Sequence, residues 1–151
     1  MTTIVEVSLT KEVLEPGALD VRLASYRDSG ARVVFAGQAR DEGGKVKSLF
    51  VEHFSGMAET SIRTICERAG EKWSLNRIVV VHRTGNVAAG EDLVQVAVSA
   101  DHRSAAFTAC EYVMDYLKSN APLWKKEIGP DSARWVDAKS SDAAAVKRWS
   151  E

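Results

Sequence analysis

Apolar and polar residues follow two periodicities along this chain, one typical of strands and one typical of helices. Alternating or β-branched apolar runs predict strands at 4–9, 32–37, 48–54, 77–83 and 92–100. Apolar residues at steps of three and four predict helices at about 19–26, 58–73 and 104–120. Shorter strand-like segments follow at 123–128 and 134–138, and a small helix ends at Trp149. Helices and strands are therefore interspersed along the chain.

The links between the strands indicate how they pair. ARDEGGKVK, which reads as a mobile loop, joins 32–37 to 48–54, and TGNVAAGE joins 77–83 to 92–100. Short links favour antiparallel neighbours over repeated βαβ crossovers. No internal repeat or linker divides the sequence. We therefore predict a single α+β domain over residues 1–151.

Composition and charge exclude several classes of protein. The chain is 45% hydrophobic and 27% charged, with 20 basic and 21 acidic residues and a formal charge of -1. This balance leaves no overall basic field for nucleic acid or an anionic membrane. No apolar stretch approaches the roughly 18 residues of a membrane span, and the N-terminus does not resemble a secretion signal. We expect a cytoplasmic protein.

The sequence also lacks the common metal, nucleotide and nucleophile motifs. The residues His53, His82 and His102 lie on separate segments without metal-ligand spacing, so we expect no metal and no bound cofactor. Neither a P-loop nor a GxSxG elbow is present. Cys66 and Cys110 fall on apolar helix stripes, which predicts buried, inert thiols without a disulfide.

The helix predicted at 104–120 carries the first candidate for chemistry. Its apolar stripe contains Ala106, Phe107, Cys110, Val113, Met114 and Leu117. Lys118 falls beside this stripe, so its stem can lie on the core while its ammonium is partly desolvated at the rim. Such an amine can act as a base or nucleophile. The structural alternative is a lysine that reaches solvent at the favourable end of a helix.

Two further lysines follow the end of this helix. Because Pro122 stops the helix, Lys125 and Lys126 leave on a strand-like segment that can return toward Lys118. Successive side chains on a strand face opposite ways, so only one of the two should point toward Lys118, and the pattern does not choose between them. Two neighbouring ammonium groups lower each other's pKa and attract an anion.

Two other positions suit an anion. Asp101, His102 and Arg103 lie where a buried strand turns into the helix, and backbone amides at a helix N-terminus bind phosphate. Plain capping by Asp101 or Ser104 explains the same residues equally well. Arg40 follows another apolar strand and is similarly open to either a binding or an ordinary surface role.

These residues lie in strings that resemble a known family. HRSAAF at 102–107 and MDYLKSNAPLWKKE at 114–127 resemble the most distinctive stretch of the MoaE family, the large catalytic subunits of molybdopterin synthase. The likeness extends through VVFAGQAR at 33–40, LFVEHFSGMAE at 49–59, VVVHRTGNVAAGED at 79–92 and RWVDA at 134–138. It covers nearly the whole chain and weakens before residue 30.

The resemblance implies a fold, an activity and an assembly. The fold would be an α/β-hammerhead with an additional antiparallel sheet. The enzyme would be a sulfurtransferase that converts cyclic pyranopterin monophosphate into molybdopterin, a step of molybdenum cofactor biosynthesis. The sulfur would come from the C-terminal thiocarboxylate of a ubiquitin-like small subunit of the MoaD family. Two large subunits would form a homodimer at the centre of a heterotetramer.

The resemblance also implies roles for particular residues. Lys118 and Lys125 match the catalytic lysines, with Lys118 as general acid/base or transient acyl acceptor and Lys125 stabilising charge on the substrate. The substrate-binding positions match Gln38, Ala39, Arg40, His102, Arg103, Lys126 and Glu127. His102, Arg103 and Arg40 would hold the phosphate.

Three features depart from the family pattern. Gln38 replaces a residue that is often basic, Lys139 replaces an arginine found in some members, and the loop 41–46 is short. These three departures predict that the contacts to the phosphate or the pterin are rearranged. Two other functions remain open: a docking module without turnover, which both lysines argue against, and a Schiff-base lyase using Lys118, for which no second catalytic group is recognisable.

Overall fold

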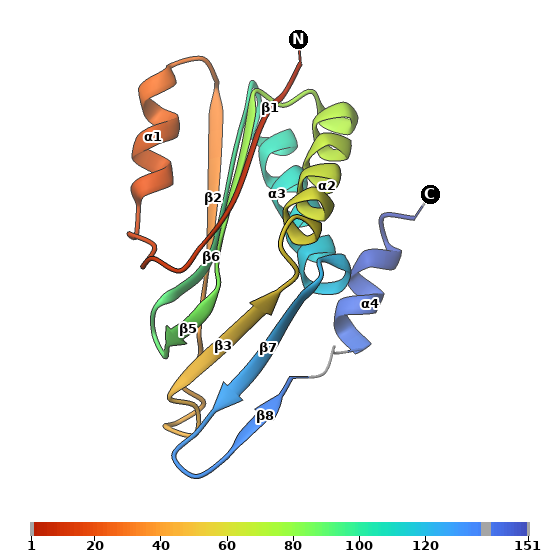
Figure 1. Cartoon of the computed structure of the whole chain (residues 1–151). Helices are drawn as coiled ribbons and strands as arrows, with labels where there is room; N and C mark the ends of the chain where they lie inside the picture. Colours follow the sequence, from red (N-terminus) through yellow and green to blue (C-terminus); the bar gives the residue numbers. More distant parts are fainter. Residues whose placement is uncertain (1, 137–139, 151) are drawn as a thin grey trace.

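The computed structural model describes residues 2–136 and 140–150 as two four-stranded sheets and four helices (Figure 1). The first sheet has the order β1 (Ile4–Thr10), β4 (Arg77–Arg83), β6 (Asp92–Ala100) and β2 (Ala31–Gln38). The second has the order β5 (Gly85–Ala88), β3 (Ser48–His53), β7 (Leu123–Ile128) and β8 (Ala133–Trp135). The helices are α1 (Ala18–Tyr26), α2 (Met57–Trp73), α3 (Arg103–Asn120) and α4 (Ser140–Lys147). The predicted α+β class is confirmed.

Strand β6 organises the first sheet. All nine of its residues are buried, and it pairs antiparallel with both β4 and β2. The predicted antiparallel pairing of 77–83 with 92–100 is therefore confirmed. β1, for which no partner was predicted, pairs parallel with β4.

A second prediction of pairing is wrong. β2 and β3 were expected to be neighbours, but they belong to different sheets. Residues 85–88, expected to belong to a turn or bulged connection, form strand β5, whose Val87 is fully buried in the core of the second sheet. Alternation along a strand tells which face is buried, but it does not tell which strand lies alongside.

Helices cover both faces of the first sheet (Figure 1). α2 and α3 pack on one face over the main hydrophobic core, and α1 packs on the other through Leu19 and Leu23. Cys66 and Cys110 are buried and free in the main core, as predicted. Burial raises the pKa of the Cys66 thiol to about 12 and that of the Cys110 thiol to about 11, so both stay protonated and unreactive.

The second sheet is wholly antiparallel, which confirms the expected additional antiparallel sheet. One of its faces packs against the end of the first sheet, where Ala39, Val51, Val87 and Leu93 form a small buried cluster. Val51 pairs with Lys125 across β3 and β7, so the side chain of Lys125 lies on this packed face.

Helix α4 packs beside the C-terminal end of α3. The Trp149 ring, just after α4, meets Trp73 and Tyr112 edge to face at centroid distances of 5.8 and 5.4 Å. Its indole N–H donates to the Asp115 carboxylate at 2.6 Å, and the Ser119 hydroxyl donates to the Asp142 carbonyl oxygen at 3.0 Å. These contacts hold α4 next to Lys118. No helix among the described residues has both the length and the apolar character needed to cross a membrane.

A close backbone approach fixes the turn between β6 and α3. The Gly30 amide donates to the Ala100 carbonyl oxygen at 3.0 Å, and a Cβ at residue 30 would overlap with the carbonyl oxygen of Asp101. Gly30→Ala should therefore lower the free energy of unfolding by about 2–4 kcal/mol, because backbone on both sides must shift. Urea unfolding would measure this, with Ser29→Ala as the control. Equal stability of the two variants would contradict the close approach.

Candidate functional site

Two lysines meet where α3 ends and β7 begins. Lys118 lies in the last turn of α3, and the chain then reverses at Ala121, whose carbonyl oxygen accepts a hydrogen bond from the Leu123 amide at 2.8 Å. β7 runs back antiparallel to β3, and its alternation places Lys125 on the packed face. Lys126 lies on the opposite face. Lys125, and not Lys126, is therefore the lysine that lies near Lys118.

The two lysines differ in burial. Burial lowers the pKa of Lys125, and the positive charge of Lys118 lowers it further, while the Asp142 carboxylate on α4 acts in the opposite direction. Lys118 itself is exposed. The partial desolvation predicted for Lys118 therefore falls on Lys125, because β7 is flanked by β3 and β8 whereas the last turn of α3 ends at the surface.

Lys126 and Glu127 have partners of their own. The Lys126 ammonium lies 5.5 Å from the centroid of the Trp135 ring, on the face turned away from Lys125. Glu127 shares the face of Lys125, and its carboxylate accepts a hydrogen bond from Arg134 at 2.9 Å. Of these two predicted substrate-binding residues, only Glu127 lies on the same face as the lysine pair.

Residues 38–40 lie at the end of β2 near the second sheet. Gln38 is exposed at a bulge, whereas Ala39 is only 1% exposed and both its backbone groups are bonded, to Glu91 and Gly90. Ala39 therefore anchors the strand end. The side chain of the next residue, Arg40, is 74% exposed, and its Nε lies 3.8 Å from a Glu42 carboxylate oxygen.

The loop 41–46 is a compact hydrogen-bonded turn. The Asp41 carboxylate accepts from the Gly43 amide at 3.0 Å, and its carbonyl oxygen accepts from Gly44 and Val46 at 3.0 and 2.9 Å. Val46 is buried. Lys139, the other departure noted in the sequence, lies outside the described residues.

His102 and Arg103 begin α3, at its other end. His102 is the extended N-cap residue, and no side chain in the described part of the chain caps the helix, so the plain capping interpretation is wrong. Both residues are exposed. First-turn amides without a capping side chain remain available to an anion.

The structure does not bring this pair together with the lysines. Fifteen residues of helix, about 23 Å, separate Arg103 from Lys118. Arg40 is similarly far from His102 and Arg103. β2 pairs Ala31 with Ala100, near this basic pair, and Gln38 with Asp92 at the opposite end of a strand about 23 Å long. The expectation that His102, Arg103 and Arg40 hold one phosphate is therefore wrong for a single chain.

An exposed apolar surface lies beside Arg103. Phe107, one turn further along α3, is 62% exposed, so its predicted place in the apolar stripe is wrong. Phe35 on the edge strand β2 is 40% exposed, and its backbone amide donates a hydrogen bond to the sulfur of the buried Cys110. Large exposed apolar side chains beside a strand edge are typical of protein interfaces.

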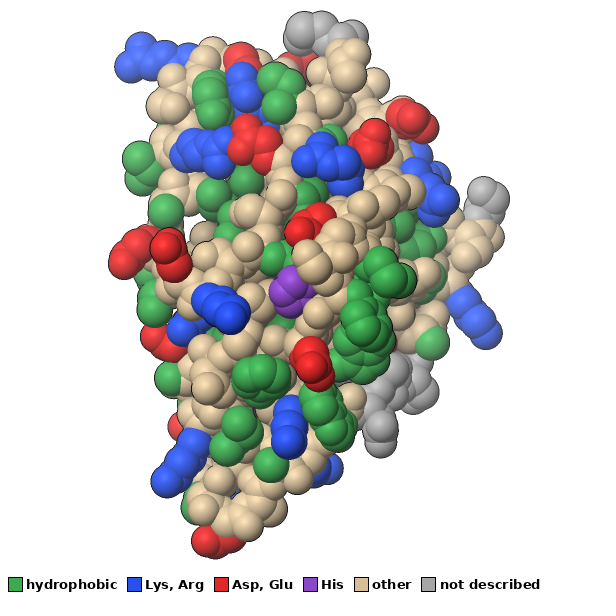
Figure 2. Space-filling model, viewed as in Figure 1, with side chains coloured by type: hydrophobic (Ala, Val, Ile, Leu, Met, Phe, Trp, Pro, Cys, Tyr) green, Lys and Arg blue, Asp and Glu red, His purple; other side chains and the backbone are tan. Residues whose placement is uncertain are grey.

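A second exposed apolar surface covers the outer face of the second sheet. Figure 2 shows hydrophobic side chains gathered over β3 and β7. Phe54, Met57, Trp124 and Trp135 are each between 44% and 59% exposed, and the Phe54 and Trp124 rings meet edge to face at 5.1 Å. This aromatic surface flanks the strand that carries Lys125.

Sequence reasoning missed two histidines behind the lysine pair. His82 on β4 is 3% exposed, and its Nδ1 lies 2.8 Å from the Arg83 carbonyl oxygen, which only accepts, so Nδ1 carries the proton. Burial, together with the smaller effects of the Lys125 and His53 charges, lowers the pKa of His82 to about 4, although the hydrogen bond to the Arg83 carbonyl acts in the opposite direction. His53 ends β3 on the face of Lys125, a position that its spacing of two from the buried Val51 indicates.

The burial of a neutral His82 predicts a loss of stability in acid. Its pKa is about 4 when folded against an ordinary 6.5, so the unfolded chain binds the extra proton. The free energy of unfolding should therefore fall as pH drops from about 6.5 to about 4, by about 3 kcal/mol. Urea titrations across this range would measure it. His82→Gln should lose this part of the pH dependence and the exposed His102→Gln should keep it; identical profiles for wild type and His82→Gln would contradict it.

Comparison with known proteins agrees with this architecture. The model of the MoaE protein family matches residues 9–120. The molybdopterin synthase catalytic subunit of Pseudomonas aeruginosa is 46% identical over 148 residues, covering 96% of this chain and 99% of its own. That of Vibrio cholerae is 45% identical over 145 residues, covering 95% and 97%. The MoaE protein structure from Burkholderia ambifaria has a TM-score of 0.81 at 39% identity, covering 100% of this chain and 99% of its own.

The structure is a mixed α+β protein in which two lysines lie close together where α3 meets the second sheet. Sequence and structural relatives then agree on one family over almost the whole length. The chain belongs to the MoaE family.

Proposed function

We propose that this chain is the catalytic subunit of a molybdopterin synthase and transfers sulfur to cyclic pyranopterin monophosphate. The observation that carries the proposal is the half-buried Lys125 beside the exposed Lys118, at the end of α3. The names of relatives that match nearly the whole chain support it. The chain acts as a single domain over residues 1–151, in the cytoplasm.

The two lysines have complementary roles in this proposal. Lys118, exposed at the rim, meets the incoming acyl terminus and the substrate, and serves as acid/base or transient acyl acceptor. Lys125, whose pKa is lowered, takes up the proton that Lys118 gives off and stabilises charge at the substrate. Sulfur from the terminal thiocarboxylate bonds to a substrate carbon and displaces an oxygen there, and water then attacks the donor's acyl carbon, so that the donor ends as a carboxylate.

The sulfur donor is a ubiquitin-like small subunit of the MoaD family. Its extended C-terminal tail must reach the lysine pair while its globular part rests nearby. The exposed aromatic surface of Phe54, Met57, Trp124 and Trp135 flanks β7 and offers an apolar face for a protein partner. Glu127 lies on β7 on the face of Lys125, and Arg40 follows Ala39, which packs against Val51 of β3; in this proposal both contact the substrate.

A homodimer completes the site in this proposal. Within one chain, His102 and Arg103 lie too far from Lys118 to share its substrate. A second copy seated on the exposed Phe35 and Phe107 would bring its own basic turn to the first copy's lysines. Two large subunits would then share two sites and bind one small subunit each, as a heterotetramer.

Reconstitution tests the proposed function. The purified chain is mixed with cyclic pyranopterin monophosphate and a thiocarboxylated small subunit, and molybdopterin is measured. The matched control is the same small subunit with an ordinary C-terminal carboxylate. Product only with the thiocarboxylate is the expected result. A stable complex of the two subunits without product would instead indicate a docking module that lacks turnover.

A further inference from the structure

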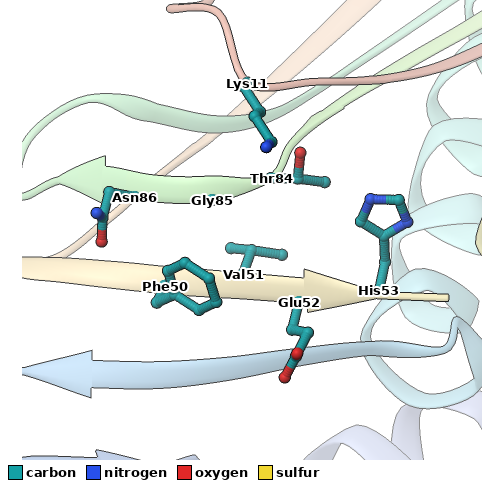
Figure 3. Close-up of a pocket in the computed structure, with 8 residues that line it drawn as sticks. All are labelled: Lys11, Phe50, Val51, Glu52, His53, Thr84, Gly85 and Asn86. Atoms are coloured by element: carbon teal, nitrogen blue, oxygen red, sulfur yellow. The ribbon is translucent and has the colours of Figure 1, made fainter. Parts of the chain in front are cut away.

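His53 combines two features that the proposed mechanism leaves unused. Its Nδ1 is buried and has no hydrogen-bond partner among the described residues. The same side chain lines an open pocket of about 380 Å³ together with Thr84, Gly85 and Lys11 (Figure 3). A buried polar atom without a partner costs free energy, so its retention beside an open pocket calls for an explanation.

His53 lies within reach of Lys125. β3 and β7 pair Val51 with Lys125 and His53 with Leu123, so His53 and Lys125 are diagonal neighbours on one face of the sheet. Diagonal neighbours have Cα atoms about 7–8 Å apart, a separation that a lysine side chain can bridge. In Figure 3 the His53 ring projects on the same side of β3 as Val51, whereas Glu52 projects away.

The charged groups around Lys125 leave His53 as the best proton acceptor. Lys118 faces it from α3, Asp142 from α4 and His82 from β4. Lys118 is a second ammonium. The Asp142 carboxylate favours the charged form of Lys125, and the buried His82 stays neutral down to about pH 4. The His53 side chain lines the open pocket, so its imidazole can pass a proton between Lys125 and water.

We propose that His53 carries the proton of Lys125 to solvent during sulfur transfer, an inference that rests on the proposed function. The Lys125 ammonium gives one proton to an unprotonated His53 nitrogen, which leaves a neutral amine and an imidazolium. The imidazolium then releases that proton to water in the pocket beside Thr84. The neutral Lys125 is thereby ready to accept the next proton from Lys118. His53 is a positioning and relay residue, because it acts on the substrate only through Lys125.

Two variants of His53 separate proton transfer from packing. His53→Asn keeps a polar atom near the position of Nδ1 but cannot take up a proton, and His53→Ala leaves space for a small base. Both should lower the single-turnover rate of molybdopterin formation about 10- to 100-fold at neutral pH. The loss should shrink as pH rises, because hydroxide replaces the relay. Added imidazole should restore His53→Ala. Glu52→Gln, the adjacent change on the other side of β3, should stay within about twofold of wild type.

Each result decides the proposal. Normal rates for both variants, or a loss that neither pH nor imidazole changes, would overturn the relay while leaving the proposed function intact, provided that wild type forms product and Lys125→Ala does not. Full activity of His53→Asn beside an inactive His53→Ala would show a purely structural role. A wild-type chain without turnover would overturn the proposed function and the relay together.

Discussion

Lys118→Ala is expected to reduce molybdopterin formation by about a hundred- to ten-thousandfold, with the small subunit still bound. The amine at residue 118 is the exposed member of the lysine pair, and Lys125 cannot take its place because it is held on the packed face of the second sheet. Single-turnover product formation would measure the first effect, and titration calorimetry with the small subunit would measure the second.

Lys72→Ala is the matched control, because Lys72 is also an exposed lysine in the last turn of a helix. It should keep wild-type activity. Turnover of Lys118→Ala near the wild-type rate would rule out the lysine mechanism. Loss of small-subunit binding in the same variant would instead make Lys118 a docking residue.

Mixing two inactive variants should restore activity if two copies share each site. Lys118→Ala and Arg103→Ala should each be nearly inactive alone. In a mixed dimer, one site receives an intact Lys118 from one copy and an intact Arg103 from the other. Random exchange makes half of the dimers mixed, each with one working site of two, so activity should recover to about a quarter of wild type.

Subunit exchange is verified with a mass tag on one variant, and a Lys118→Ala sample mixed with tagged Lys118→Ala is the control that should stay inactive. No recovery despite confirmed exchange would mean that His102 and Arg103 act at a place apart from the lysines. Full activity of Arg103→Ala alone would remove the basic turn from substrate binding.

The order of the elements was largely predictable because burial imposes a period on each of them. β7 spans Leu123–Ile128, as its sequence predicted, and α3 begins at Arg103, one residue before the expected start. The mispairing of β2 with β3 has a physical reason: the pairing partner depends on contacts between distant residues, which the period of one strand does not encode.

The candidate site was only partly predictable. Pro122 correctly placed Lys118 near the end of α3, and alternation correctly allowed only one of Lys125 and Lys126 to join it. Choosing Lys125 required the register of β7 against β3. Which lysine is desolvated depends on covering elements, and His53 and His82 approach Lys125 only through folding.

The distance between the basic turn and the lysines also lay beyond the sequence. His102 and Arg103 are 15 residues from Lys118, and only the formation of one straight helix turns that interval into about 23 Å. Because of this separation, we propose that the basic turn of a second copy of the chain completes the site.

The most direct test of the central claim follows the sulfur atom. The small subunit is prepared with a heavy sulfur isotope in its thiocarboxylate, incubated with the chain and cyclic pyranopterin monophosphate, and both products are weighed by mass spectrometry. Heavy sulfur in the pterin, with the small subunit recovered as a carboxylate, is the predicted result. Heavy sulfur that remains on the small subunit in a fully formed complex would contradict the account.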